Sequence, residues 1–213
     1  MSARGTGREA VLDRFAVSRE SAERLDLYVS LLLTWQAQIN LIGPSTQEDV
    51  WTRHVADALQ LLPYLPANLT RLADLGSGAG IPGLILAIVR PVEAHLFESN
   101  QKKGAFLREA ARRTGARAFI HSARIEAAAE PEAARLKVGA VTARALAPLP
   151  KLLDYAQPFL EKGAIGYFHK GQDVDAELTE ATKSWKIQVE KHPSHTDSRG
   201  VILVVKEAHR VRC

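Results

Sequence analysis

Four of the eight residues from Gly76 to Gly83 are glycine, and they lie between a short apolar run, Leu72–Leu75, and an apolar helical segment. Glycine lets the backbone turn tightly and leaves its amide groups bare, so a ligand can lie against them where the next helix begins. Pro82 is compatible with a first helical turn, since its missing N–H would have no partner there. A strand, a tight turn and a helix in this order are typical of nucleotide-cofactor sites in α/β proteins.

The residues around this turn indicate which cofactor it binds. Gly78–Gly83 matches the GxGxxG pattern, which is compatible with a dinucleotide such as NAD. Asp74 favours S-adenosylmethionine, because a carboxylate before the turn would repel a pyrophosphate but can hold a cationic methionine end, directly or through water. Glu98 ends the next apolar run about 20 residues beyond the turn, where a ribose is recognised by either cofactor. We expect S-adenosylmethionine, with an NAD-dependent oxidoreductase as the alternative.

From residue 71 onward, apolar strands alternate with helical segments, which predicts a parallel sheet with right-handed crossovers. The expected strands are 72–75, 92–98, 117–121, 138–144, 164–170, 187–191 and 201–206. The expected helices are 84–89, 101–113, 125–129, 149–159 and 174–183. Because only residues 193–200 separate the last two strands, these strands should pair antiparallel. The pattern predicts a Rossmann-like class I methyltransferase fold: a seven-stranded, mostly parallel sheet with the last strand antiparallel.

The first 70 residues follow a helical pattern instead. Apolar side chains recur at helical spacing from Leu25 to Ile39, after Ser18 as a plausible N-cap. A second helix is expected from about residue 46 to 62, ended by Pro63. We therefore expect a helical N-terminal extension, residues 1–70, and a cofactor-binding methyltransferase domain, residues 71–213, in one compact unit.

The net charge of +4 is unevenly distributed. Residues 1–70 carry six Lys and Arg against eight Asp and Glu, whereas residues 71–213 carry 22 against 16. The half that holds the glycine turn is therefore basic, which is typical of proteins with a polyanionic substrate. An ordinary basic surface is the alternative explanation.

The composition excludes several other classes of protein. No apolar run approaches the ~20 residues needed to cross a bilayer, and the first eight residues lack the apolar segment of a signal peptide. The only cysteine is Cys213, so neither an intrachain disulfide nor a thiolate metal cluster can form. His192 and His195 flank Pro193 without the carboxylate pattern of a metal site. We expect a cytoplasmic monomer with no metal and no membrane association.

Several polar residues lie where the sheet would present them to a ligand. Arg144 and Lys170 end predicted strands, and ligands of open α/β sheets bind beyond the carboxyl ends of the strands. Arg144 could clamp a phosphate or a base edge, or form an ion pair with a neighbouring carboxylate. Arg53 and Asp57 lie one helical turn apart and could pair with each other. From its place in a predicted helix alone, His54 is expected to be an ordinary histidine on the helix surface.

Together these segments resemble the RsmG family, also called GidB, the bacterial 16S ribosomal RNA guanine-N7 methyltransferases. The segments that carry the resemblance are Asn40-Leu41-Ile42, Arg53-His54-Val55-Ala56-Asp57-Ala58, the run from Asp74 to Gly83, Arg124-Ile125-Glu126, the run from Arg144 to Leu149, Lys170-Gly171 and Arg199-Gly200-Val201. The resemblance extends from about residue 10 to residue 210.

The resemblance implies roles for residues that match the family. The cofactor would contact Asp74, Gly76, Gly78, Gly80, Ile81, Glu98, Ile125, Glu126 and Arg144, with Glu98 at the ribose and Ile125-Glu126 at the adenine. RNA would contact Arg53, His54, Arg144, Lys170 and Arg199. No residue is expected to act as an acid or base, and Arg144 would position the reacting groups.

The implied reaction is methylation of N7 of a guanine in 16S rRNA, at position 527 in the 530 loop, with the small ribosomal subunit as partner. Guanine N7 carries a free lone pair, so no general base is needed. A non-catalytic RNA-binding or ribosome assembly factor with the same fold is a further alternative.

Overall fold

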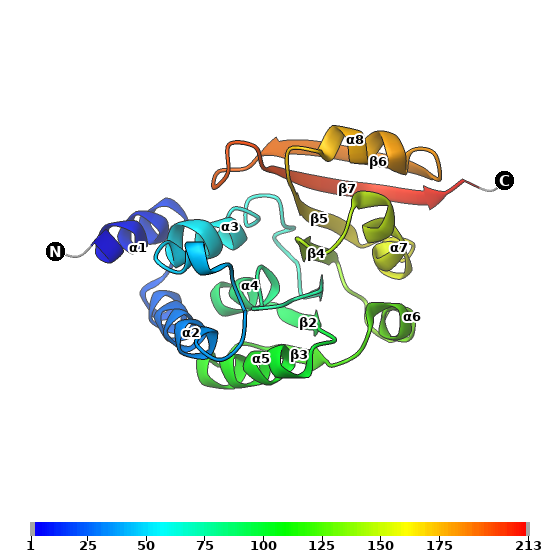
Figure 1. Cartoon of the computed structure of the whole chain (residues 1–213). Helices are drawn as coiled ribbons and strands as arrows, with labels where there is room; N and C mark the ends of the chain where they lie inside the picture. The colour runs from blue at the N-terminus through cyan, green and yellow to red at the C-terminus, as the bar shows by residue number, and fades with distance from the viewer. Residues whose placement is uncertain (1–2, 212–213) are drawn as a thin grey trace.

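The computed structural model describes residues 3–211 and centres on a seven-stranded sheet with helices on both faces (Figure 1). Cys213 lies outside the described residues. The strands are β1 Arg71–Leu75, β2 Glu93–Phe97, β3 Ala118–His121, β4 Ala140–Arg144, β5 Ile165–Lys170, β6 Trp185–Pro193 and β7 Val201–Arg210. The helices between them are α4 Gly83–Val89, α5 Gln101–Thr114, α6 Ile125–Arg135, α7 Leu149–Leu160 and α8 Val174–Ala181. The N-terminal segment forms α1 Ala3–Arg14, α2 Arg19–Gln36, the 3-10 helix η1 Pro44–Thr46, the π-helix η2 Trp51–Val55 and α3 Ala56–Leu59.

The strand order is β3-β2-β1-β4-β5-β7-β6. β1 pairs in parallel with both β2 and β4, whereas β7 runs antiparallel between β5 and β6. The predicted seven-stranded sheet and its antiparallel last strand are confirmed. Because the chain moves outward from β1 to β3 and then returns to β4, the strand order reverses between β1 and β4. Ligands of such sheets bind at this reversal point, beyond the carboxyl ends of the strands.

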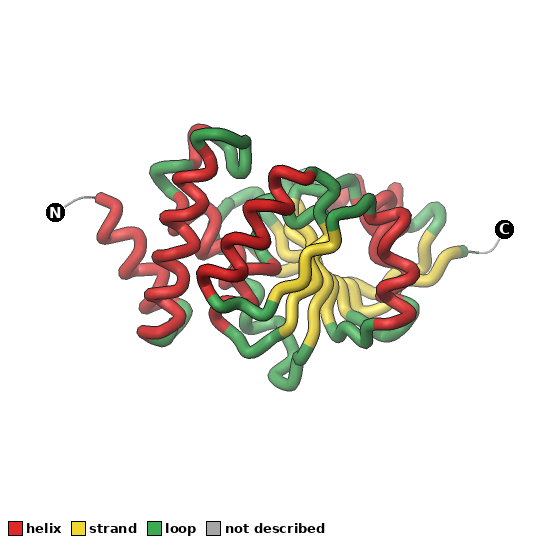
Figure 2. The backbone as a smooth tube through the Cα atoms, turned by 90° about the horizontal axis from the view of Figure 1, so that it is seen from below, coloured by secondary structure: helices red, strands yellow, loops and turns green. Residues whose placement is uncertain are grey.

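Two apolar clusters cover the sheet, and Figure 2 shows the strands lying between two groups of helices. One core cluster joins β1, β2, α4 and α5 to the N-terminal helices, and the other packs α6, α7 and α8 on the opposite face. The central strands are buried over nearly their whole length, which explains their continuous apolar runs. The first cluster includes both Leu25 of α2 and Leu72 of β1, so the N-terminal segment shares a core with the sheet.

Local signals set the ends of the long helices. Ser18 Oγ accepts a hydrogen bond from Ser21 N at 3.2 Å and caps α2 as predicted. Asn100 Oδ1 accepts from the backbone N–H groups of Lys102 and Lys103 and starts α5. These two caps set the residues at which α2 and α5 begin.

The N-terminal segment differs from the expectation in two respects. The helix expected over residues 46–62 is shorter than predicted and begins as a π-helix: η1 ends at Thr46, and η2 and α3 follow one another without a break from Trp51 to Leu59. Thr46 Oγ1 donates to Gly43 O and Thr52 Oγ1 donates to Asp49 O, and such side-chain bonds to the backbone compete with helix formation. The helix α1 was not expected, since its first turns contain glycine and threonine, which are weak helix formers.

Candidate active site

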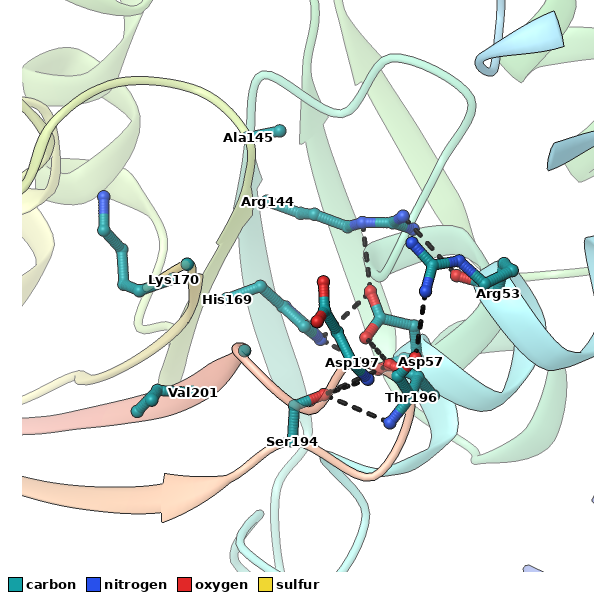
Figure 3. A pocket seen from close by; sticks show the side chains of 12 residues that line it. Arg53, Asp57, Arg144, Ala145, His169, Lys170, Ser194, Thr196, Asp197 and Val201 are labelled. Atoms are coloured by element: carbon teal, nitrogen blue, oxygen red, sulfur yellow. Dashed lines mark hydrogen bonds and ion pairs between the residues drawn. The ribbon is translucent and has the colours of Figure 1, made fainter. Parts of the chain in front are cut away.

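Three cavities lie next to one another at the reversal point of the sheet. The first, the β2 cavity of about 140 Å³, is lined by Gly76, Phe97, Glu98, Ser99, Ala123, Arg124, Ile125, Glu126, Leu146 and Tyr155. The second, the loop cavity of about 280 Å³, is lined by Leu41, Ile42, Gly43, His54, Gly76, Ser77, Gly78, Ala79, Ile81, Lys103, Arg144 and Ala145. The third, the hairpin cavity of about 250 Å³, is lined by residues of α3, β4, β5 and the β6–β7 turn (Figure 3).

Single residues form the walls between these cavities. Gly76 lines both the β2 cavity and the loop cavity. Arg144 and Ala145 line both the loop cavity and the hairpin cavity. A ligand that extends from Glu98 across the glycine loop would therefore reach Arg144, and a second ligand in the hairpin cavity would meet it there.

The glycine loop follows β1 and has a backbone that only glycine accommodates. Gly76 has a φ of +66°, and a Cβ there would lie 2.5 Å from Leu146 Cδ1. Gly80 has a φ of +83°, and its Cβ would lie 2.6 Å from Leu84 Cβ. The close approach of Leu146 and Leu84 therefore depends on the absence of side chains at these two positions. Ile81 and Gly78 belong to the wall of the loop cavity.

Asp74 lies behind this loop, contrary to the expectation that its carboxylate faces the ligand. The residue is 1% exposed, and its Oδ1 accepts a hydrogen bond from Thr142 Oγ1 at 2.6 Å. A Cβ on Gly83 would lie 2.5 Å from Asp74 Cβ, so the carboxylate lies directly beneath the start of α4. Burial raises the pKa of Asp74 to about 6. The side chain supports the loop and lines none of the three cavities.

Glu98 follows β2 and lines the β2 cavity. Its Oε2 accepts from Gly78 N at 2.9 Å, and its Oε1 accepts from Asn100 N at 2.7 Å. The carboxylate thereby fixes the glycine loop relative to the start of α5. Across the cavity, Ile125 begins α6, and Glu126 accepts a hydrogen bond from the Tyr155 hydroxyl at 3.0 Å.

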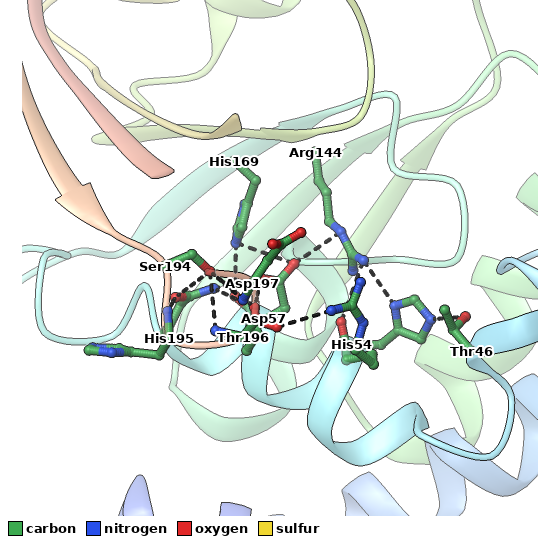
Figure 4. A network of polar contacts seen from close by, with 11 residues as sticks. Thr46, His54, Asp57, Arg144, His169, Ser194, His195, Thr196 and Asp197 are labelled. Carbon is green, nitrogen blue, oxygen red and sulfur yellow. Dashed lines mark hydrogen bonds and ion pairs between the residues drawn. The ribbon is translucent and has the colours of Figure 1, made fainter. Parts of the chain in front are cut away.

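Arg144, the last residue of β4, is held by two groups from the N-terminal segment (Figure 4). Its Nε lies 3.0 Å from Asp57 Oδ2. Its Nη2 donates to Nδ1 of His54 at 3.0 Å. The ion pair that the sequence left open is therefore present, and its partner is Asp57. The side chain nevertheless remains 25% exposed at the wall between the two cavities.

His54 is 5% exposed and lies beneath Arg144, so it does not present its ring to the surface as an RNA-facing residue would. Its Nε2 is 2.7 Å from Thr46 Oγ1, which itself donates to Gly43 O. Nε2 therefore carries the proton and Nδ1 accepts from Arg144. Burial, and next the positive charge of Arg144, lower the pKa of His54 to about 4. The ring is neutral at physiological pH.

Asp57 joins more segments than the sequence indicated. Besides Arg144, its Oδ1 accepts from Thr196 Oγ1 at 2.6 Å and from Gln60 Nε2 at 2.5 Å. The Nε2 of His169 donates to its backbone carbonyl at 2.8 Å. This network ties α3 to β4, β5 and the β6–β7 turn. From the sequence, Asp57 was expected only to pair with Arg53 and to belong to a segment that matches the family, and neither signal indicates these distant partners.

Of the three other cations expected to contact RNA, the two arginines lie near the hairpin cavity. Arg53 donates to the carbonyl of Thr196 at 3.1 Å from the rim of the hairpin cavity. Arg199 is exposed on the β6–β7 turn, with its Nη1 3.3 Å from Gln172 Oε1.

Lys170 lies in the wall of the hairpin cavity, but its amine is paired within the chain, although a contact with RNA was expected (Figure 3). Its Nζ lies 2.5 Å from Glu177 Oε2, and its side chain is only 8% exposed. It also donates to Ala147 O at 3.1 Å. In the same segment, Ala145 has a φ of +50°, a conformation that L-residues other than glycine adopt at a cost. Lys170 therefore braces the strained turn that follows Arg144.

Two absences hold for the described residues. Between residues 3 and 211, no group of three or more His, Cys, Asp and Glu is placed to hold a metal ion. No helix in that range is long and apolar enough to cross a membrane.

Comparisons with known proteins agree on one family. The pattern of the GidB family, rRNA small subunit methyltransferase G, matches residues 21–202. A ribosomal RNA small subunit methyltransferase G from Methylobacterium nodulans is 53% identical over 201 residues, covering 92% of this chain and 93% of that protein. Its counterpart from Paramagnetospirillum magneticum is 47% identical over 206 residues, covering 97% and 98%.

Solved structures of lower similarity share the fold. The ribosomal protein L11 methylase from Lactobacillus delbrueckii subsp. bulgaricus superposes with a TM-score of 0.58 at 16% identity. The superposition covers 73% of this chain and 79% of that one. The architecture is thus that of a Rossmann-like methyltransferase.

Proposed function

The chain belongs to the GidB family of rRNA small subunit methyltransferases, and on that premise we propose that it transfers a methyl group from S-adenosylmethionine to N7 of a guanine in the 530 loop of 16S rRNA. Membership of this family sets aside the NAD-dependent oxidoreductase that the GxGxxG pattern left open. The remaining alternative, a non-catalytic RNA-binding factor, is separated from the proposal by the experiment below.

One relationship carries the proposal: Arg144 and Ala145 form the wall shared by the loop cavity and the hairpin cavity. A cofactor in the loop cavity and a base in the hairpin cavity would meet at this wall. Transfer between two bound groups gains most from their alignment, which can supply ~7–11 kcal/mol of a barrier.

The β2 and loop cavities fit S-adenosylmethionine chemically. Glu98 holds one backbone amide on each oxygen and retains lone pairs that can accept from ribose hydroxyls. Ile125 and Glu126 would contact the adenine at the opposite wall. At Gly78 a Cβ would meet no atom closer than 3.9 Å, so the bare backbone leaves room for the methionine end. When bound, the cofactor supplies an electrophilic methyl group.

Arg144 is the residue that would orient the guanine. Its hydrogen bonds within the chain use Nε and Nη2, and the Nη1 amine remains for a base edge or a phosphate. Because guanine N7 needs no deprotonation, this site requires no general base. His54 and Asp57 fix the guanidinium without taking part in proton transfer.

The rim of the hairpin cavity would contact the RNA backbone. Arg53 lies on that rim, and Arg199 extends from the neighbouring β6–β7 turn. Both are exposed cations suited to phosphate contacts, which position an RNA without reading its sequence. We propose that the partner is the small ribosomal subunit and that the protein acts as a cytoplasmic monomer.

The test is transfer of a labelled methyl group from S-adenosylmethionine to small ribosomal subunits that lack this modification, followed by mass spectrometry of the nucleosides. We expect N7-methylguanosine in 16S rRNA. Label in another nucleoside would contradict the assigned atom. Cofactor binding without any transfer would contradict the substrate, and neither binding nor transfer would favour the RNA-binding factor.

Arg144→Ala tests the assigned role within the same assay. We expect turnover to fall at least about 100-fold while the Kd of the cofactor changes by less than about threefold, because the residue acts on alignment rather than on cofactor binding. A parallel loss of both quantities would contradict this role.

A further inference from the structure

Helix α2 lies outside the sheet, yet two of its buried polar side chains reach the walls of the loop cavity. Tyr28 contacts the glycine loop, and Gln36 contacts the segment from Leu41 to Ile42. These two segments are among the linings of the loop cavity.

Tyr28 is fully buried among apolar side chains. Its hydroxyl donates to the carbonyl of Ala79 at 2.7 Å, and its ring lies 6.3 Å from that of Phe106, centroid to centroid. A tyrosine hydroxyl is costly to bury without a hydrogen-bond partner. The buried Tyr28 ring therefore holds the Ala79 carbonyl in the position where it accepts this bond. The bond fixes one peptide of the loop that lines the cavity.

Both polar atoms of the Gln36 amide bond to the segment from Leu41 to Ile42, which lines the loop cavity. Its Oε1 accepts from Leu41 N at 2.8 Å and from Ile42 N at 2.9 Å. Its Nε2 donates to Ile42 O at 2.9 Å. The side chain is buried. It supplies the hydrogen-bond partners that the backbone of this non-helical segment would otherwise lack.

We propose that α2 sets the separation of the two walls of the loop cavity, and that Tyr28 and Gln36 are positioning residues for the methionine end of S-adenosylmethionine. The inference rests on the proposed function, since it assigns that ligand to the cavity. The N-terminal helices then belong to the cofactor site and do more than cover one face of the sheet. Neither side chain contacts the β2 cavity, so the adenosine end is bound independently of them.

The experiment compares two ligands that share the adenosine end. S-adenosylhomocysteine carries the amino acid end, whereas 5′-methylthioadenosine lacks it. Calorimetry would give the Kd of each ligand for the wild type, Tyr28→Phe and Gln36→Glu. Tyr28→Phe removes only the hydroxyl, and Gln36→Glu keeps the acceptor but sets a carboxylate oxygen against the carbonyl of Ile42. Val29→Ala, a neighbouring apolar change on α2, controls for lost packing.

Tyr28→Phe should raise the Kd of S-adenosylhomocysteine about five- to tenfold, as expected for one lost hydrogen bond. Gln36→Glu should raise it at least as much, since a repulsive contact replaces the bond to Ile42. The Kd of 5′-methylthioadenosine should change by less than about twofold, and Val29→Ala should alter neither value. Equal losses for both ligands, or the same loss in Val29→Ala, would overturn the inference. A wild type that binds neither ligand would instead overturn the proposed function.

Discussion

Asp57 Oδ2 lies 3.0 Å from Nε of Arg144, so a carboxylate of the N-terminal segment holds the arginine that separates the loop cavity from the hairpin cavity. Asp57 is itself held by the β6–β7 turn through Thr196. The orientation of Arg144 is therefore set by parts of the chain outside the central sheet, and the first prediction tests this dependence.

Asp57→Asn keeps the shape of the side chain and removes the charge that faces Arg144. Turnover should fall about 10- to 100-fold because a misplaced guanidinium no longer aligns the substrate. The Kd of S-adenosylhomocysteine should stay within about twofold, since Asp57 lines neither the β2 cavity nor the loop cavity. Methyl-transfer kinetics and calorimetry measure the two quantities. Asp26→Asn, which breaks the remote Arg8–Asp26 pair, should retain wild-type turnover. Wild-type turnover in Asp57→Asn would refute the dependence.

Alanine at Gly80 should mainly lower stability, whereas alanine at Gly78 should mainly lower cofactor affinity. Gly80→Ala places Cβ 2.6 Å from Leu84 Cβ, and the overpacking with a positive φ should lower the free energy of unfolding by about 2–5 kcal/mol. Gly78→Ala meets open space and should cost only about 1–2 kcal/mol. Its methyl group would occupy the loop cavity, so cofactor affinity should fall at least about tenfold. Urea denaturation of the free protein and calorimetry provide the comparison. An unimpaired cofactor affinity in Gly78→Ala would place the ligand elsewhere.

His54 should make stability depend on pH between its two pKa values. Its pKa is about 4 in the folded protein against an ordinary value of 6.5, so the unfolded chain binds the additional proton between these limits. Its contribution is present above pH 6.5 and is lost as the pH falls toward 4, by up to ~3 kcal/mol. His54→Asn keeps an acceptor near Nδ1 and does not titrate.

The difference between the unfolding free energies of wild type and His54→Asn, measured at pH 7 and at pH 4.5, isolates this contribution. Asp74 acts in the opposite direction, because its raised pKa of about 6 makes stability fall as the pH rises from its ordinary value of 3.8. That effect is common to both proteins and cancels. A pH-independent difference would mean that His54 has the same pKa in the folded and unfolded states.

Lys170 should stabilise the fold rather than contact RNA. Lys170→Met leaves Glu177 without its ion-pair partner, and unfolding should become easier by about 2–4 kcal/mol. The double variant Lys170→Met/Glu177→Gln removes the stranded charge and should recover most of this loss. The dependence of RNA affinity on salt concentration should keep its wild-type slope in the double variant. A slope reduced by about one would identify Lys170 as a phosphate contact instead.

The sequence contained enough information for the sheet and the glycine loop because both depend on local patterns. Apolar runs marked the strands to within a few residues, and the positive φ values of Gly76 and Gly80 lie where the glycines predicted a tight turn. The partners of Asp57 were not predictable in the same way, because Arg144 and Thr196 come from distant segments. Glu177 is only seven residues from Lys170, but the two lie on different elements, β5 and α8, whose packing no local pattern gives. Asp74 was placed correctly at the end of a strand, but which side of the loop its carboxylate occupies depends on Thr142 in the adjacent strand.

The contacts of the β6–β7 turn have a consequence for the time at which the protein becomes active. Ser194 and Thr196 bond to Gln60 and Asp57, and they follow β1 to β5 in the chain, so they leave the ribosome after those strands. Until then the hairpin cavity lacks one wall and Arg144 lacks the network that fixes its anchor, even if β1 to β5 have already formed. Contacts between distant segments also form late in folding. A nascent chain could therefore bind cofactor before it can act on RNA.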